Sequence, residues 1–135
     1  MPYEKHWEKG GVVTRYWGFI DGGELADSCE SIAADPRFDD LRFVIQDFAT
    51  IDGHDIDAAS IERIAVCRIG SMASNPNIRV LMVTVDEGVA AVKSQLESPR
   101  YGETFETRVF ASVTLARQWL KEQPAVQKTA ARFGR

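Results

Sequence analysis

A cluster of acidic residues with one histidine is the part of this sequence best suited to chemistry. The stretch 47–57 holds Asp47, Asp52, His54, Asp55 and Asp57. Carboxylate oxygens bind Mg²⁺ and Ca²⁺, but the spacing differs from that of an EF-hand loop, which alternates acidic or amide residues before a glycine and a later glutamate. Helix capping accounts for Asp55 or Asp57 without a metal. No glycine-rich phosphate-binding motif occurs either, so we predict neither a metal nor a cofactor.

His54 offers a second kind of chemistry. With Asp52 orienting its imidazole, it could act as a general base, but no activated serine or cysteine nucleophile can be identified beside it. Thr50 could be phosphorylated, although a threonine in such a bend typically hydrogen-bonds the local backbone. We favour a water-exposed His54, an unmodified Thr50 and a protein that is not an enzyme. Acid–base chemistry by His54 and Asp52 stays as the alternative.

Large apolar side chains form the other candidate site. They are Trp7, Trp17, Phe19, Phe48, Met72 and Met82. Such a set can line a pocket for an apolar ligand, and the strand predicted at 12–20 carries bulky groups on both faces. The same residue types are also typical of an ordinary core. We favour the core and keep an apolar pocket formed by Trp17, Phe19, Phe48, Met72 and Met82 as the alternative.

The elements that must position these residues alternate along the chain. Gly10 and Gly11 predict the turn of an amino-terminal hairpin. The apolar run 41–48 predicts a buried strand, followed by a polar turn at 49–55 and a helix at 56–72. Further strands are predicted at 78–85 and 105–110, and further helices at 21–34, after residue 86 and after Ser112. In parallel sheets ligands are received at the carboxyl ends of strands, where the polar turn falls.

The predicted helix at 56–72 has one apolar side. It carries Ile61, Ile64, Ala65, Ile69 and Met72, whereas Glu62, Arg63 and Arg68 are expected away from that side. Taken together, the elements predict an α/β protein with a single-layer, mixed, mostly parallel five-stranded sheet and four helices. We expect one domain at 1–123 and a basic tail at 124–135.

The order and spacing of these elements, from about residue 12 to 120, resemble the STAS domain family, the fold of bacterial anti-sigma-factor antagonists, and its uncharacterised stand-alone SpoIIAA-like branch. The segment 18–21 is similar to the family's corner into its first helix. The strand ending at Asp47, followed by Ile51 and Asp52, is similar to its switch strand. Val109 and Phe110 before a capped helix resemble its last strand and helix.

The resemblance implies a partner-binding surface made of Asp21, Asp47, Thr50, Asp52, Gly53, His54 and Asp55. In signalling members the motif Asp-Ser-Ser-Gly opens the second helix and its second serine is phosphorylated. Here the positions read Asp52-Gly53-His54-Asp55, so the aspartate matches and the serine is replaced by His54. Asp55 and Asp57 already place carboxylates where a phosphate would meet the helix start. A serine phosphoswitch is therefore not expected.

Composition limits the function classes. A formal net charge of -4 leaves no excess of lysine and arginine for a phosphate backbone, so nucleic-acid binding is not expected. The two cysteines, Cys29 and Cys67, form no C-x-x-C pair, which argues against a disulfide framework or a zinc site. No apolar leader or membrane-spanning run occurs in the sequence, and we expect a cytoplasmic protein.

The hypothesis we favour is a non-enzymatic regulatory or binding module that acts through a protein partner at the loop 50–57. The alternative is a carrier or sensor of a small apolar, lipid-like ligand with peripheral membrane association. A homodimer is compatible with either.

Overall fold

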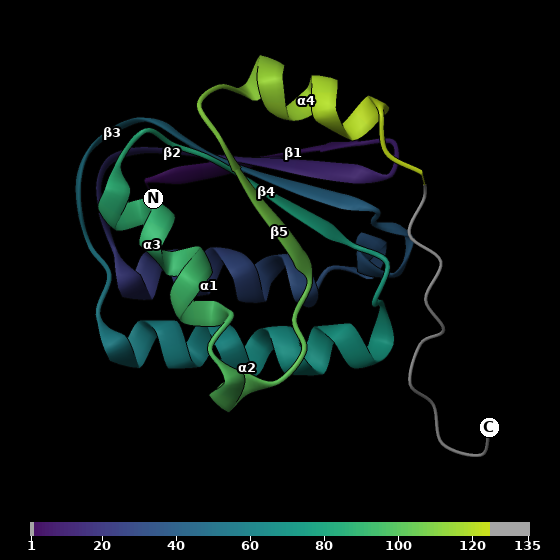
Figure 1. The fold of residues 1–135 in the computed structure, drawn as a ribbon, viewed down its shortest axis with the longest axis horizontal. Helices are drawn as coiled ribbons and strands as arrows, with labels where there is room; N and C mark the ends of the chain where they lie inside the picture. Colours follow the sequence, from purple (N-terminus) through teal and green to yellow (C-terminus); the bar gives the residue numbers. More distant parts are fainter. Residues whose placement is uncertain (1, 125–135) are drawn as a thin grey trace.

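In a computed structural model of the chain, residues 2–124 can be described, and they form a five-stranded sheet with helices on both faces (Figure 1). The strands are β1 (Tyr3–Glu8), β2 (Gly11–Asp21), β3 (Phe43–Asp55), β4 (Arg79–Val83) and β5 (Glu106–Phe110). The α-helices are α1 (Gly22–Ala33), α2 (Ala58–Ser74), α3 (Glu87–Leu96) and α4 (Val113–Lys121), with short 3-10 helices at Pro36–Asp40 and Pro99–Tyr101. The predicted tail at 124–135 lies outside the described residues apart from residue 124.

The strands follow one another across the sheet in chain order. β1 and β2 pair antiparallel as the predicted hairpin, and β2 through β5 pair parallel. Gly10 takes φ +72 in the hairpin turn, a conformation that costs a side-chain-bearing residue energy. The predicted α/β class and the mostly parallel sheet are confirmed.

The two faces of the sheet are covered unequally. In Figure 1, α1, α2 and α3 lie on one face and α4 alone lies on the other. Beneath the first three helices, β2 contributes fully buried side chains from alternate positions, including Val12, Tyr16 and Ile20. Under α4 the core is smaller and centres on Ile45, Leu81, Val83 and Ala116. One end of the α4 face therefore lacks a covering helix.

The predicted polar turn at 49–55 is wrong. Residues 49–55 continue β3, and their backbones pair with the second half of β2, out to Asp21 beside Asp55. Gly18, at φ +68, lies between two register shifts that let the strands stay paired. The apolar pattern stops at Phe48 because residues 49–55 are mostly polar. The sequence pattern therefore did not reveal that these residues pair with β2.

The predicted apolar side of α2 is also wrong at two positions. Arg68 is 8% exposed and faces the core, whereas Ile69 is 49% exposed. The inner face runs through Ile61, Ile64, Ala65, Arg68 and Ser71. Positions 61, 64, 65 and 68 share one face of a helix, and this face of α2 is turned toward the sheet. Arg68 therefore points inward, and Ile69, the next residue, points outward.

Candidate functional site

Aspartates cap the helices that follow β2 and β3. Asp21 caps α1 by accepting from the Glu24 backbone N–H at 2.7 Å, and the Glu24 carboxylate accepts from the Asp21 N–H in return. Asp57 caps α2 by accepting from the Ser60 N–H, and its pKa is lowered by hydrogen bonds from the side chain and backbone of Ser60. These caps place the carboxyl ends of β2 and β3 rigidly against the helices.

Two predicted site residues hold β3 in shape. Asp47 accepts from the backbone N–H of Ala49 at 3.0 Å, and the hydroxyl of Thr50 donates to the carbonyl of Tyr16 on β2 at 3.1 Å. Thr50 thus bonds to the backbone of the neighbouring strand rather than to the local backbone of a bend, which was the expected alternative to phosphorylation. Both contacts lie where the register between β2 and β3 shifts.

His54 meets a carboxylate that the sequence reasoning missed. Its Nε2 lies 2.9 Å from Oδ1 of Asp86, which also caps α3 by accepting from the Val89 N–H at 3.0 Å. The Val89 backbone and His54 lower the pKa of the Asp86 carboxyl. The structure thus pairs His54 with Asp86 rather than with Asp52. The sequence signal for Asp86 was its position before the predicted helix, but its separation of 32 positions from His54 hid the contact.

Asp52 and Asp55 remain on the surface at this end of the sheet. Both are exposed, and neither takes part in the helix caps. Gly53 between them lies against the Phe19 ring, because a Cβ at Gly53 would come within 3.3 Å of Phe19 Cδ2. The structure therefore gathers Asp21, Gly53 and Asp55 around paired positions of β2 and β3.

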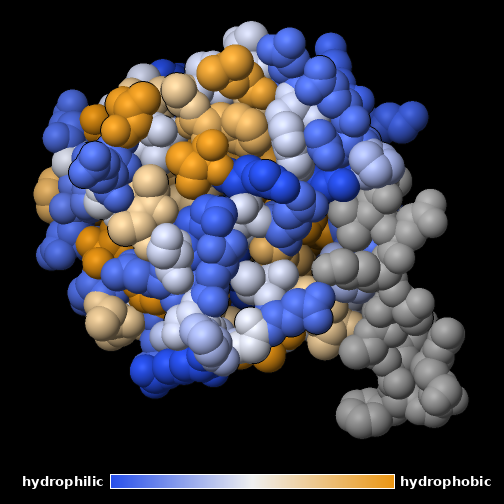
Figure 2. Space-filling model, viewed as in Figure 1, coloured by the Kyte–Doolittle hydropathy of each residue, from blue (hydrophilic) through white to orange (hydrophobic). Residues whose placement is uncertain are grey.

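Two large aromatic side chains stand next to this acidic segment. Trp17 is 39% exposed and Phe19 is 60% exposed, and they pair in register with Thr50 and Gly53. We call Trp17 and Phe19 the aromatic patch. Because Tyr16 and Ile20 on the same strand point into the core under α1 and α2, alternation puts the patch on the α4 face. Figure 2 shows apolar side chains among polar ones on the upper left of the molecule.

The residues of the predicted apolar pocket do not come together. Phe48 stacks on Tyr16 at 4.5 Å between ring centroids, and Met82 is a fully buried core residue. Met72 packs against the same core from α2, whereas Trp17 and Phe19 lie on the opposite face. A different cavity, of about 50 Å³, lies between α1, α2 and the sheet. It is small for the alternative function, because ligand pockets typically measure about 300–1,000 Å³.

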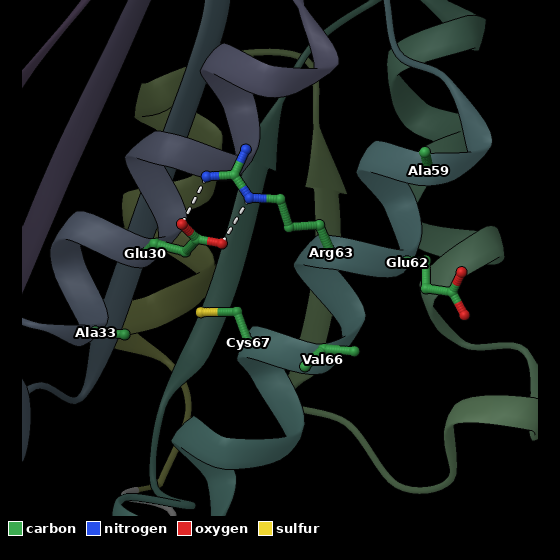
Figure 3. Close-up of a pocket in the computed structure, with 7 residues that line it drawn as sticks. All are labelled: Glu30, Ala33, Ala59, Glu62, Arg63, Val66 and Cys67. Atoms are coloured by element: carbon green, nitrogen blue, oxygen red, sulfur yellow. Dashed lines mark hydrogen bonds and ion pairs between the residues drawn. The ribbon is translucent and has the colours of Figure 1, made fainter.

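A groove of about 590 Å³ runs along the outer surface of α1 and α2 (Figure 3). Arg63 crosses it to the Glu30 carboxylate, with Nε–Oε2 at 2.7 Å, and also binds Asp27. Cys67 in Figure 3 points from α2 toward α1. The ion pairs of Arg63 with Glu30 and Asp27 cross this groove and link α2 to α1.

Two absences within residues 2–124 bear on function. No group of three or more histidine, cysteine, aspartate or glutamate side chains there is arranged to hold a metal ion. None of the helices in this part of the chain is long and apolar enough to cross a membrane.

The class that this architecture defines is an α/β domain whose parallel strands end in an acidic, aromatic surface. No protein-family model matches the sequence, and no curated protein is significantly similar to it. Among solved structures, the unphosphorylated anti-sigma factor antagonist SpoIIAA is similar, with a TM-score of 0.57 and 13% identity over 90% of this chain and 99% of that one. An uncharacterised DUF3478 protein with a SpoIIAA-like fold from Shewanella loihica PV-4 has a TM-score of 0.50 and 13% identity over 87% of this chain and 91% of that one. The chain therefore has the SpoIIAA-like fold.

Proposed function

We propose that the protein is a non-enzymatic, cytoplasmic regulatory module that binds a protein partner through the aromatic patch and the neighbouring segment 50–57. The observation that carries this proposal is the exposure of Trp17 and Phe19 on an otherwise polar strand end. Exposed tryptophan and phenylalanine side chains that lie side by side are typical of interaction sites. The SpoIIAA-like fold supports a regulatory role, since the similar solved structure is an anti-sigma factor antagonist.

The strand ends that carry this surface are fixed by contacts within the folded chain. Thr50 ties β3 to β2, and the capping aspartates tie both strands to their helices. A preformed surface loses little conformational entropy on binding. Asp52 and Asp55 add negative charge beside the patch, so the partner should present an apolar anchor site bordered by lysine or arginine.

Phosphorylation of a serine does not belong to this proposal. The hydroxyl nearest the start of α2 is that of Ser60, and it packs against Gly22 so closely that a Cβ there would lie 2.3 Å from the Ser60 oxygen. A phosphoryl group on this hydroxyl would have to displace its contact with Gly22. The Asp57 carboxylate already accepts the Ser60 N–H, so the helix start has a permanent negative charge instead of a switchable one.

The test is affinity capture from the native organism with three versions of the protein. The first is wild type, the second carries Trp17→Ala and Phe19→Ala, and the third carries Asp52→Ala. We expect a protein captured by wild type to be lost with the double variant and weakened with Asp52→Ala, because the anchor and the charged rim are removed in turn.

A control variant, Leu115→Ala, changes an exposed apolar residue on α4, 48% exposed, and should capture the same protein as wild type. Circular dichroism must show equal folding of all versions. If the double variant captures the same partners as wild type, the proposed surface is wrong.

A further inference from the structure

The most unusual group outside the proposed surface is the buried guanidinium of Arg68. It lies on the inner face of α2, and its Nη1 donates to the hydroxyl of Thr107 on β5 at 3.0 Å and more weakly to that of Thr104 at 3.4 Å. No carboxylate within residues 2–124 forms an ion pair with it. The Cys29 and Cys67 thiols and, more weakly, the Glu97 carboxylate act on it through space, and Glu97 Oε1 is bound to Lys93 Nζ at 2.8 Å.

An arginine in this position is costly without a counter-charge. Burial lowers the pKa of Arg68, but a guanidinium keeps its proton at neutral pH and has five N–H donors. Both hydroxyls are reached through Nη1, so Nε and Nη2 have no protein acceptor in the described part of the chain; neither is fully buried, and both are open to solvent. Buried charges in folded proteins are almost always paired.

Arg68 lines the partly open cavity of about 50 Å³ between α1, α2 and the sheet. The walls come from α1, β3, α2, β4 and the segment before β5, and they are lined by Cys29, Ile32, Val44, Gln46, Cys67, Arg68, Ser71, Ile78, Val80 and Phe105. The lining contains one positive charge and no carboxylate. The amide of Gln46, 6% exposed, adds N–H donors, one of which meets the Cys29 sulfur at 3.7 Å.

We propose that this cavity binds a monovalent inorganic anion of the size of chloride, held by the guanidinium of Arg68 and the side-chain amide of Gln46. The volume suits this class of ligand, because a cavity of about 10–15 Å³ holds one water molecule and 50 Å³ holds an ion with a few waters. A single arginine neutralises one negative charge. A divalent anion would bring an unpaired charge against walls of isoleucine, valine and phenylalanine, which is strongly unfavourable.

The anion would act as a structural ligand. It would lie between α2 and the sheet on the face opposite the aromatic patch, so it does not depend on the proposed partner surface. Because it binds the folded chain only, its binding raises the free energy of unfolding by mass action.

The first test measures urea unfolding of the full chain while sodium chloride replaces sodium gluconate at constant ionic strength. At a chloride concentration about ten times the dissociation constant, the folding equilibrium constant should rise about tenfold. Arg68→Met should remove this dependence. Arg63→Met is the matched control, since it changes an exposed arginine of the same helix, and it should keep the chloride response of wild type.

The second test uses wild type alone and remains decisive if Arg68→Met fails to fold. Crystals grown with sodium bromide should show an anomalous peak within hydrogen-bond distance of the Arg68 guanidinium. Equal stability of wild type in chloride and gluconate, or a cavity without a bromide peak, overturns the proposal, because water would then satisfy the guanidinium.

Discussion

At the scale of single residues, His54 links the end of β3 to the start of α3. Its imidazole fills the space above Gly88 at the start of α3, where a Cβ would lie 2.7 Å from His54 Cε1. The same imidazole bonds to the capping Asp86. A histidine expected to be a loop residue in water is thus a packing contact between the end of β3 and α3, and its position depends on Gly88 having no side chain.

We expect Gly88→Ala to cancel the gain of about 1 kcal/mol that alanine gives a helix over glycine, so that the variant is no more stable than wild type. The added methyl group must push the imidazole away from Asp86. His54→Ala removes the clash, so the double variant should recover the helix-propensity gain. Urea unfolding of the four proteins gives a coupling free energy, which we expect at about 0.5–3 kcal/mol. Additive effects of the two substitutions would contradict the contact.

At the scale of elements, local pattern predicted most of the fold and failed where contacts are distant in sequence. The helix predicted at 21–34 is α1, capped by Asp21, and the helix predicted after residue 86 is α3, which buries Val89, Val92 and Leu96. The second half of β3 was missed because backbone pairing with β2, across some 30 residues, holds it in place of apolar side chains. The buried Arg68 was missed because a charged residue is expected outside unless a partner is known.

The paired end of β2 and β3 can be tested through two glycines. Gly18 has φ +68 and Gly70 has a helical conformation in α2, and a Cβ at either would meet no atom within 4 Å. Any effect of alanine is therefore a backbone effect. Gly18→Ala should cost about 1–2 kcal/mol, because a left-handed conformation strains a residue with a Cβ.

Gly70→Ala should instead stabilise the protein by about 0.5–1 kcal/mol, because alanine loses less backbone entropy in a helix. Urea unfolding of both variants beside wild type makes the comparison. If Gly18→Ala leaves stability unchanged or raises it, the left-handed conformation of Gly18 is contradicted; a loss of stability in Gly70→Ala would contradict only the helix-propensity argument.

At the scale of the whole molecule, the two faces of the sheet differ in how completely helices cover them. The face under α1, α2 and α3 contains the larger core and the Arg68 cavity, whereas the α4 face leaves the aromatic patch open. Arg117 on α4 binds Glu8 of β1 through two hydrogen bonds, at 2.8 and 3.0 Å. This contact directs α4 toward the hairpin turn and away from the carboxyl ends of β2 and β3, so the aromatic patch is exposed in the folded chain.

The stability of the whole chain should fall on both sides of neutral pH. Hydrogen bonds from Arg37 lower the pKa of Asp35 to about 2, and those from Arg117 lower the pKa of Glu8. A carboxyl whose pKa is lower in the folded state contributes stability above its ordinary value and loses it as pH falls through the folded value. The acid loss should therefore run from about pH 5 to about pH 2, and it should be shallow because these pairs are exposed.

The alkaline side has a different cause, which lies in the core. Cys29 is only partly covered as a residue, but its thiol is desolvated, and this burial raises its pKa from 9.0 to about 11. Unfolded chains then release the proton before folded ones do, so stability is complete below pH 9 and is lost as pH rises toward 11.

We expect Cys29→Ala to lower stability at neutral pH by leaving a small void, yet to flatten the decline between pH 9 and 11. Urea midpoints measured across this range for both proteins provide the comparison, and an equally steep decline in Cys29→Ala would show that another group, such as the buried Tyr16, controls the alkaline loss.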